Sequence, residues 1–325
     1  MGTRTTTSAF DEFDGNLNLD TGERLQAQDT HKKITDLLLT AGIIVYAFLQ
    51  GSFARKTMIA PLRDIDKVVV LTNRFRGWHP NAVMDEIQRV LAAAYPEATF
   101  DRTRHSLQMD FGPTSFYFDI VPAWETESTD DDVCIANRDT GAWDRSNTRT
   151  LMRVVSDRNG DTNGRFIHQI RMVKQVVKNL LDGAIPGLHV ESWAYLDITT
   201  SMPDDEAAAR ILATGARVLG QPYHDPTGVD LISARLKPDV IFRAKPVLDQ
   251  AAADAARALT LAAEGRHEAA IAIWHRIFGD EFPAPSDSDL STLRASFLGT
   301  GITAAGRVSP IATQRTQPVR PWGSS

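Results

Sequence analysis

Three things are scarce in this sequence: cysteine, long apolar runs and excess positive charge. Cys134 is its one cysteine, so an intramolecular disulfide and a cysteine-ligated zinc cluster are excluded, and a reducing compartment is expected. There is no run of about 18 apolar residues and no apolar segment at the N-terminus, so we expect neither a membrane span nor secretion. The formal net charge of −6 disfavours a protein that coats DNA. We therefore expect a cytoplasmic protein without a membrane partner.

The composition is otherwise that of an ordinary globular protein. Hydrophobic residues make up 42% and charged residues 23% of the 325 positions, which disfavours wholesale disorder and coiled-coil rods. A chain of this length fits one large domain or two lobes that share a cleft.

The first half of the chain has the pattern of mixed helices and strands. The apolar run 43–49 fits either a strand or a helix, because short runs are ambiguous by pattern alone. Elsewhere the spacing of apolar residues and the β-branched runs are informative. They predict helices over 19–39 and 80–94 and strands over 65–71, 106–111 and 115–121. A lobe of α/β or α+β type follows from this order.

The second half is predicted to be mostly helical. Loop-rich stretches cover 137–147 and 157–163, and helices are expected over 166–181, 190–198, 204–219, 247–264 and 268–278. We divide the chain into a flexible N-terminus (1–17), a first lobe (18–150), a helical C-terminal lobe (151–298) and a flexible tail (299–325). The arginines between 145 and 171 are either ordinary surface charge or the phosphate-binding mouth of a cleft.

One short constellation carries most of the chemical information. Gly51-Ser52 is followed, after eleven residues, by Asp64-Ile65-Asp66 at the head of a valine-rich strand. Two aspartates two positions apart on a strand point to the same face and can converge on one divalent ion. A glycine lets backbone amides approach a phosphate closely, and the adjacent serine hydroxyl can donate to a phosphate oxygen.

A third carboxylate, Asp119, lies in the otherwise apolar strand 115–121. A carboxylate buried among aromatic residues is costly unless a metal or a cation faces it. Three strand-borne aspartates around a pair of Mg²⁺ ions, with Mn²⁺ as an alternative ion, can catalyse phosphoryl transfer. An isolated D-x-D is common at solvated strand ends, so the prediction rests on the whole set and not on that pair.

With these motifs the chain resembles the polymerase-β-like nucleotidyltransferase superfamily. The string Gln50-Gly51-Ser52-Phe53-Ala54-Arg55-Lys56-Thr57, together with the D-x-D, is similar to the bacterial cGAS/DncV-like nucleotidyltransferases (CD-NTases). Asp225-Pro226-Thr227 and the segment 279–283 also resemble family features, so the resemblance covers roughly 18–290. It implies an α+β fold: a nucleotidyltransferase lobe with a mixed β-sheet, a helical C-terminal lobe, a central cleft and a long N-terminal spine helix over 19–39.

The resemblance also implies residues that bind nucleotide. Gln50, Gly51 and Ser52 match the phosphate loop, and Lys174 suits the lysine that holds the triphosphate, although it could instead be a solvated helical lysine. The expected Ser-aromatic-His segment is replaced by 187–191, so Ser192 is the nearest candidate for the missing serine. Lys67 occupies a position that is usually apolar in the family. Asp64, Asp66 and Asp119 are the predicted catalytic and metal-binding residues.

The function implied by the resemblance is the synthesis of a cyclic di- or trinucleotide second messenger for anti-phage signalling. NTPs, ATP among them, would be the substrates, and a separate effector would read the product. Two alternatives stay open: linear nucleotidyl transfer to an RNA, protein or small molecule, and a catalytically silent nucleotide-binding scaffold. The C-terminal tail, which ends at 322–325, is a candidate docking site for a regulatory protein.

Overall fold

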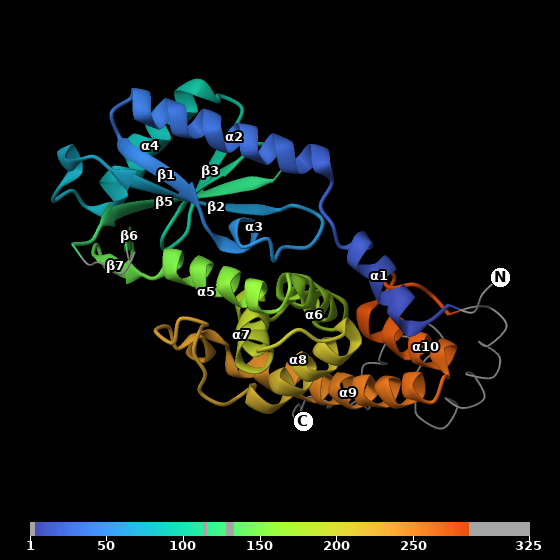
Figure 1. Ribbon diagram of the computed structural model, residues 1–325. Helices are drawn as coiled ribbons and strands as arrows, with labels where there is room; N and C mark the ends of the chain where they lie inside the picture. The colour runs from blue at the N-terminus through green and yellow to red at the C-terminus, as the bar shows by residue number, and fades with distance from the viewer. Residues whose placement is uncertain (1–3, 113–115, 128–132, 286–325) are drawn as a thin grey trace, which may run out of the picture.

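The computed structural model describes residues 4–112, 116–127 and 133–285 and arranges them in two lobes. Figure 1 shows a β-sheet lobe that carries α2 and α4 above a lobe made of helices. The helices are α1 (Thr6–Asn16), α2 (Thr21–Thr40), α3 (Gly51–Ala54), α4 (Pro80–Ala94), α5 (Thr148–Asp161), α6 (Arg165–Leu181), α7 (Gly187–Asp197), α8 (Asp204–Val218), α9 (Pro238–Ala263) and α10 (His267–Phe278). The strands are β1 (Ile44–Leu49), β2 (Asp64–Leu71), β3 (Thr99–Arg102), β4 (Leu107–Asp110), β5 (Tyr117–Glu125), β6 (Val133–Ala136) and β7 (Trp143–Ser146).

The strands form one mixed sheet. Five of them follow the order β1-β2-β5-β4-β3, and β6 pairs with β5 while β7 pairs with β6. β2 and β5 run parallel, whereas the other pairs are antiparallel. Together with the separate helical lobe, this sheet confirms the predicted α+β class, and the ambiguous run 43–49 is a strand.

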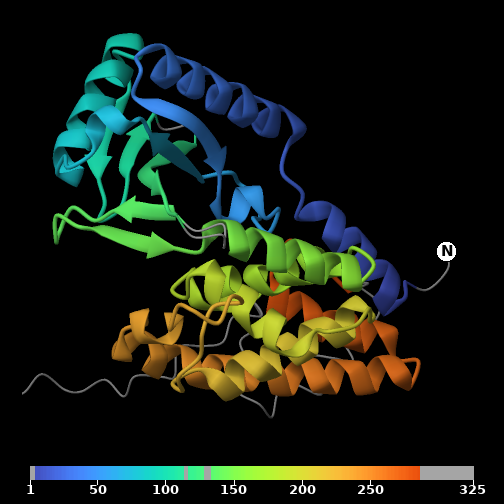
Figure 2. The ribbon, with the colours of Figure 1, turned by 60° about the vertical axis from the view of Figure 1, so that its left-hand side comes forward.

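The two faces of the sheet have different surroundings. The alternation of side chains along β2 places Ile65 and Val69 in a large core with α2 and α4, and Val68 and Val70 on the opposite face. The turned view in Figure 2 shows α2 and α4 on the side of the sheet away from the helical lobe. Residues on the same face as Val68 therefore point away from α2 and α4.

Helix α4 shows how closely local signals can define an element. Pro80 occupies its first turn, and the side chain of His79 accepts a hydrogen bond from the amide of Asn81. Apolar residues spaced three or four apart bury one face of the helix. Its bounds equal those predicted from the sequence, 80–94.

The prediction of a flexible N-terminus is wrong for residues 6–16. They form α1, whose cap is the side chain of Thr5 accepting from the amide of Ser8. Phe10 and Phe13 are almost fully buried on the C-terminal lobe. Their rings pack edge-on or tilted against a cluster made of Trp274, Phe278 and Phe282. The expected spine is therefore two helices, α1 on the helical lobe and α2 on the sheet lobe (Figure 1).

The structure also contains elements that the sequence did not indicate. β6 and β7 occupy a stretch predicted mostly as loop, and α5 covers 148–161, where no helix was expected. β6 has the apolar sequence Val-Cys-Ile-Ala but is only four residues long, and the four residues of β7, Trp-Asp-Arg-Ser, have no apolar alternation. α5 buries only a narrow stripe around Leu151 and Val155. The tail 299–325 and its candidate docking end lie outside the described residues.

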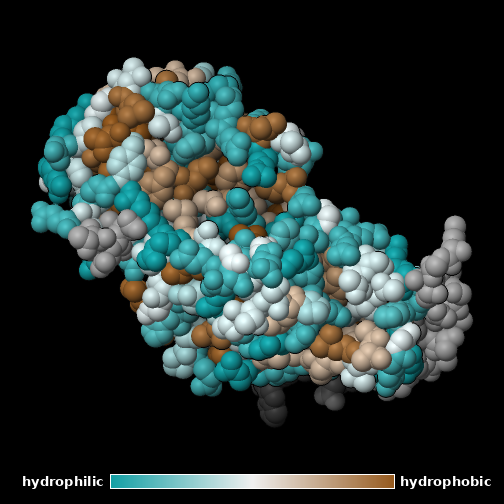
Figure 3. Space-filling view, in the orientation of Figure 1, coloured by the Kyte–Doolittle hydropathy of each residue, from teal (hydrophilic) through white to brown (hydrophobic). Residues whose placement is uncertain are grey.

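On the face shown in Figure 3, the C-terminal lobe is mainly hydrophilic, whereas hydrophobic side chains gather over part of the sheet lobe. Among the described residues, no helix combines the length and the apolar character needed to cross a membrane.

Candidate active site

The parallel pair β2 and β5 brings the predicted carboxylates together. Asp66 lies opposite Asp119 in the register, and Asp64 lies two residues before Asp66 on the same face of β2. All three are on the sheet face that α2 and α4 do not cover, the side toward the helical lobe. Residues 53 positions apart in the sequence are thus neighbours at one end of the strand pair.

The Gly-Ser loop lies directly against this cluster. Gly51 has φ of +70°, and a β-carbon at this position would lie 1.8 Å from Oδ2 of Asp66. The amide of Gln50 donates to the carbonyl of Asp66 at 2.9 Å and fixes the loop to β2. Ser52 follows in the short helix α3. A glycine is required here by backbone conformation and by lack of space.

The carboxylates repel one another in a partly buried setting. Burial, followed by the charges of Asp64 and Asp119, raises the pKa of Asp66 to about 6. Burial also raises the pKa of Asp119, although the Ser106 hydroxyl, which donates to it at 2.8 Å, acts in the opposite direction. The cluster therefore carries negative charge that the side chains of the described residues do not neutralise fully.

The donor set fits a hard divalent cation such as Mg²⁺. Carboxylate oxygens are its preferred ligands, and the raised pKa values show that a positive charge at this place would be favourable. Among the described residues, no three His, Cys, Asp or Glu side chains lie close enough to form a preformed metal cage. Three mutually repelling carboxylates have reason to stay apart until a cation joins them.

Two cavities meet at the carboxylates. Gly51, Arg55, Asp66 and Leu188 line both of them. The larger, of about 1020 Å³, extends toward β7, α5 and the loop around Asp225. The smaller, of about 410 Å³, is lined by several cationic and polar side chains: Ser52, Arg63, Lys174 and Lys178.

Lys174 lies at the wall of the smaller cavity, but it is not a solvated lysine. Its ammonium donates to Oε1 of Glu191 at 2.7 Å and to the Thr57 hydroxyl at 3.1 Å. The residue is only 8% exposed. The resemblance assigns Lys174 to the triphosphate, and its position beside the cavity is compatible with that role.

Ser192, the nearest candidate for the missing serine, is buried in α7. It is 1% exposed, and its hydroxyl donates to the carbonyl of Leu188 one turn earlier in α7. Trp193 is fully buried in the core of the helical lobe, as an amphipathic helix predicts. Ser192 is not among the residues that line the two cavities, and the nucleotide contact predicted for it stays a prediction. Leu188 lines the cavities instead.

The arginine band divides into different roles. Arg153 is exposed and lines the larger cavity. Arg149 pairs with Glu125 at 3.0 Å, and Arg158 donates to the carbonyl of Ile198 at 2.6 Å. Most of the band therefore stabilises the fold, and only part of it faces the cleft.

The loop at Asp225 forms part of the cleft wall. The carboxylate of Asp225 accepts from the Thr227 hydroxyl at 2.8 Å and from the amides of Val229 and Asp230 at 3.2 and 3.1 Å. Asp225 thus shapes its own loop through an Asx-type network.

Lys67 follows Asp66 on β2 but points to the opposite face, under α2. Its side chain is fully buried, and its ammonium donates to the carbonyl of His31 at 2.8 Å and to Thr35. Burial lowers the pKa of Lys67 to about 7, which the charge of Asp36 partly offsets. Lys67, which departs from the family pattern, therefore connects β2 to α2 through buried hydrogen bonds.

Arg55 and Glu191 are site residues that the sequence reasoning did not assign. Arg55 lies within the string 50–57 that resembles the CD-NTases, but the sequence alone assigns it no catalytic or binding role. Glu191 had one usable signal, since it is an acidic residue in a stretch of α7 whose neighbours Val190 and Trp193 are apolar. A buried carboxylate needs a cationic partner, but the partner itself lies on other elements.

Comparisons with known proteins agree with this geometry. Residues 4–159 match the family model of the Second Messenger Oligonucleotide or Dinucleotide Synthetase (SMODS) domain, a span that includes all three aspartates. A probable cyclic nucleotide synthase from Bacillus cereus is 22% identical over 293 residues, which cover 77% of this chain and 85% of that protein.

Two solved structures have a similar fold across both lobes. The Bradyrhizobium diazoefficiens CD-NTase CdnG, in complex with GTP, matches with a TM-score of 0.66 and 14% identity, over 89% of this chain and 97% of its own. CdnC from E. coli MS115-1, in complex with HORMA-deltaN, matches with a TM-score of 0.65 and 15% identity. The match covers 85% of this chain and 98% of the CdnC chain. The same CdnC has also been solved with ATP.

Proposed function

We propose that the chain is a cGAS/DncV-like nucleotidyltransferase (CD-NTase) that joins NTPs into a cyclic di- or trinucleotide second messenger with release of pyrophosphate. The observation that carries this proposal is the place of Asp64, Asp66 and Asp119. They lie beside the Gly51 loop, where a cavity with cationic walls meets a larger one.

We assign the smaller cavity to the donor NTP. The backbone at Gly51, the hydroxyl of Ser52 and the ammonium of Lys174 would bind the β- and γ-phosphates, with Arg63 and Lys178 nearby. Charge-assisted hydrogen bonds of this kind suit phosphate oxygens. Gln50 would act by holding the loop to β2 through its amide.

Asp64 and Asp66 would hold Mg²⁺, with Mn²⁺ as an alternative, and Asp119 would complete the ligand set. When bound, the metal supplies positive charge for the phosphates and lowers the pKa of a coordinated hydroxyl. Ser106, which donates to Asp119 at 2.8 Å, keeps that carboxylate oriented. Asp119 would attract the proton of the incoming ribose hydroxyl.

The reaction follows from these positions. The ribose oxygen of an acceptor nucleotide bonds to the α-phosphorus of the donor, the bond from that phosphorus to the bridging oxygen breaks, and pyrophosphate leaves. The larger cavity, of about 1020 Å³, has the size to hold the acceptor nucleotide. A second attack of the same kind, after the linear intermediate is repositioned, closes a dinucleotide ring with release of a second pyrophosphate, and a trinucleotide ring needs a third attack and a third pyrophosphate.

ATP is among the proposed substrates, since CdnC has been solved with ATP, whereas GTP is the nucleotide in the CdnG complex. We further propose that a separate effector reads the product during anti-phage signalling in the cytoplasm. The HORMA-deltaN complex of CdnC supports the idea that a regulatory protein binds this enzyme as well. Docking of such a protein at the C-terminal tail stays a prediction.

The test is to incubate the purified protein with all four NTPs and Mg²⁺ and to identify the products by mass. A phosphatase-resistant cyclic species supports the proposal. Linear products that require an added RNA, protein or small-molecule acceptor would favour the alternative of linear transfer. The D64A/D66A double variant is the control, and pyrophosphate release that survives in it would overturn the assigned mechanism. A wild-type protein that binds NTPs without releasing pyrophosphate would instead be a silent scaffold.

A further inference from the structure

Glu191 is buried at the point where the two lobes meet beside the cleft. Its side chain is 0% exposed. From the sheet lobe, Arg55 donates to it through Nε at 2.7 Å and Nη2 at 3.2 Å, and the Thr57 hydroxyl donates to it at 2.7 Å. From α6 of the helical lobe, Lys174 donates to the same Oε1 at 2.7 Å. One carboxylate therefore joins three side chains from both lobes.

The charges in this cluster depend on one another. Burial disfavours the ionised carboxylate of Glu191, but Lys174 and Arg55 outweigh that effect and hold its pKa well below the ordinary value. Burial lowers the pKa of Lys174, and Glu191 opposes this shift. Without the carboxylate, the two buried cations would face each other without the counter-ion that they share.

Both cations also face the reacting groups. Arg55 lines both cavities and acts on the Asp66 carboxyl, where its charge lowers the pKa against the effect of burial. Lys174 lines the smaller cavity, and a β-carbon on Gly187 would lie 2.8 Å from its Cε. The side chain of Lys174 is therefore held between Glu191 and the first turn of α7.

We propose that Glu191 is a positioning residue for nucleotidyl transfer: it fixes Arg55 beside the three aspartates and keeps Lys174 charged and in place for the donor phosphates. This inference rests on the proposed function, since it takes the smaller cavity as the donor site. The contacts cross from one lobe to the other, so Glu191 also sets the distance between the phosphate-binding lysine and the catalytic sheet.

Glu191→Gln tests the proposal because it keeps the size of the side chain and removes its charge. We expect kcat/KM for pyrophosphate release to fall about 10- to 100-fold, the range found for residues that orient reactive groups. We also expect the alkaline limb of the pH profile to move to lower pH, because Lys174 loses the counter-ion that keeps it protonated. Loss of packing alone would not move that limb.

The charged groups around Lys174 are consistent with a shift of the alkaline limb to lower pH in Glu191→Gln. Glu191 faces it from α7, Arg55 and Asp64 act on it from the sheet lobe, and Lys178 follows one turn later on α6. Among the described residues, only Glu191 makes a direct contact of opposite charge with the ammonium. Removing that charge therefore changes the main favourable interaction of protonated Lys174.

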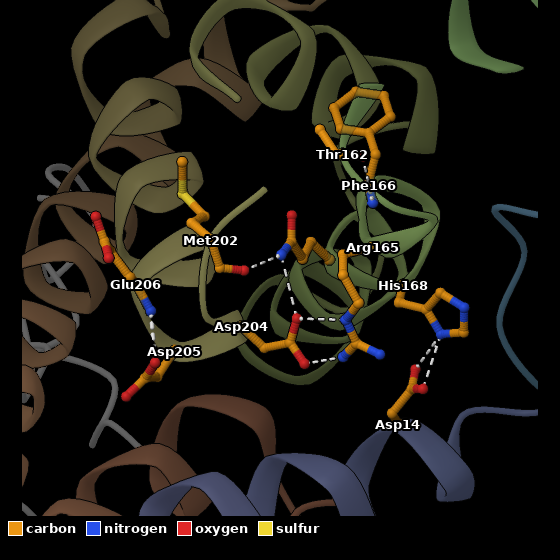
Figure 4. A network of polar contacts seen from close by, with 10 residues as sticks. Asp14, Thr162, Arg165, Phe166, His168, Met202, Asp204, Asp205 and Glu206 are labelled. Atoms are coloured by element: carbon orange, nitrogen blue, oxygen red, sulfur yellow. Dashed lines mark hydrogen bonds and ion pairs between the residues drawn. The ribbon is translucent and has the colours of Figure 1, made fainter. Parts of the chain in front are cut away.

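A matched control is available within the helical lobe. Figure 4 shows Arg165 of α6 facing Asp204 of α8, and Asp204 also accepts from Gln169 at 3.1 Å. Its side chain is 8% exposed, and it lines neither cavity. We expect Asp204→Asn to lower the melting temperature without moving the pH profile. If Asp204→Asn and Glu191→Gln lose activity equally and neither moves the limb, Glu191 is only a stabilising residue and the proposal is overturned.

Gly187→Ala provides a second variant that leaves the charge of Glu191 intact. Because the new methyl group displaces Lys174, we expect kcat/KM to fall at every pH. Wild-type kcat/KM in both Gly187→Ala and Glu191→Gln would overturn the proposal. Failure of the proposed function looks different, since the wild-type protein itself would then release no pyrophosphate from NTPs.

Discussion

Gly51 approaches Asp66 so closely that a β-carbon on the glycine would lie 1.8 Å from Oδ2 of the carboxylate. A glycine is therefore required at position 51 both by its close contact with Asp66, a proposed metal ligand, and by its positive φ. Since the carboxylate and the loop cannot both keep their places once a side chain is present, the two motifs form one structural unit.

The first prediction concerns Gly51→Ala. We expect pyrophosphate release to fall at least about 100-fold, because a displaced Asp66 disturbs the proposed metal site and the phosphate loop together. The measurement is the initial rate with NTPs and Mg²⁺. Gly265→Ala is the control, since Gly265 also has positive φ, +76°, but has nothing within 4 Å of its β-carbon position. Activity retained in Gly51→Ala would show that the loop can move away from Asp66.

The second prediction concerns the raised pKa of Asp66, about 6 against an ordinary 3.8. Between these values the folded state binds more protons than the unfolded state, so the stability of the metal-free protein falls as pH rises. We expect Asp66→Asn to have a higher free energy of unfolding than wild type at pH 7, by about 1–2 kcal/mol. The difference should vanish near pH 4.

Urea unfolding of both proteins, with and without Mg²⁺, measures this difference. Added Mg²⁺ should stabilise wild type more than Asp66→Asn, because the asparagine variant lacks one proposed ligand. A difference in stability that stays constant from pH 4 to 7 would contradict the assigned repulsion.

The third prediction concerns Lys67, whose pKa is lowered by burial to about 7 from 10.5. Above pH 7 the unfolded state binds more protons at this residue, so wild-type stability should rise with pH relative to Lys67→Met. We expect the free energy of unfolding of wild type, relative to that of Lys67→Met, to increase by up to about 1.4 kcal/mol per pH unit between pH 7 and 9. Chemical unfolding at several pH values measures it. The exposed Lys32 on α2, the helix against which Lys67 packs, provides the control, and Lys32→Met should show no such trend.

The fourth prediction concerns α1. Phe10 is 2% exposed and touches Phe13, Trp274, Phe278 and Phe282. Truncation to alanine leaves a cavity in this cluster, so we expect Phe10→Ala to lower the free energy of unfolding by about 3–5 kcal/mol. Thr7→Ala, on the exposed side of the same helix, should have little effect. Equal stability of the two variants would mean that α1 is not held by its aromatic contacts.

Where the sequence carried strong local patterns, the prediction of the fold was accurate. The helix 80–94 has a capping residue, a proline in its first turn and a regular apolar stripe, and its bounds were correct. α1 was missed because two buried phenylalanines in a polar segment give a weak signal without their partners, which lie more than 250 residues later. β7 was missed because its residues are polar and its ladder depends on β6.

In the candidate site, too, some features could be predicted from the sequence and others could not. The three aspartates follow from strand alternation and from one parallel pairing, so the residues alone were enough to group them. The partners of Lys174 were not predictable, because Thr57 and Glu191 reach it from another lobe and another helix. The orientation of Ser192 in α7 could not be predicted from the sequence, because one position on a helix turns a side chain by about 100°.

The packing of α1 against α10 also affects how the chain can fold during its synthesis. Strands β1 to β7 and helices α2 and α4 are complete once residue 146 has been made, so the sheet lobe can form early. The partners of Phe10 do not exist until Trp274, Phe278 and Phe282 have been added. Although α1 precedes the other described helices in the chain, it is thus among the last to find its place, and the helical wall of the cleft is completed only when nearly the whole described chain has been translated.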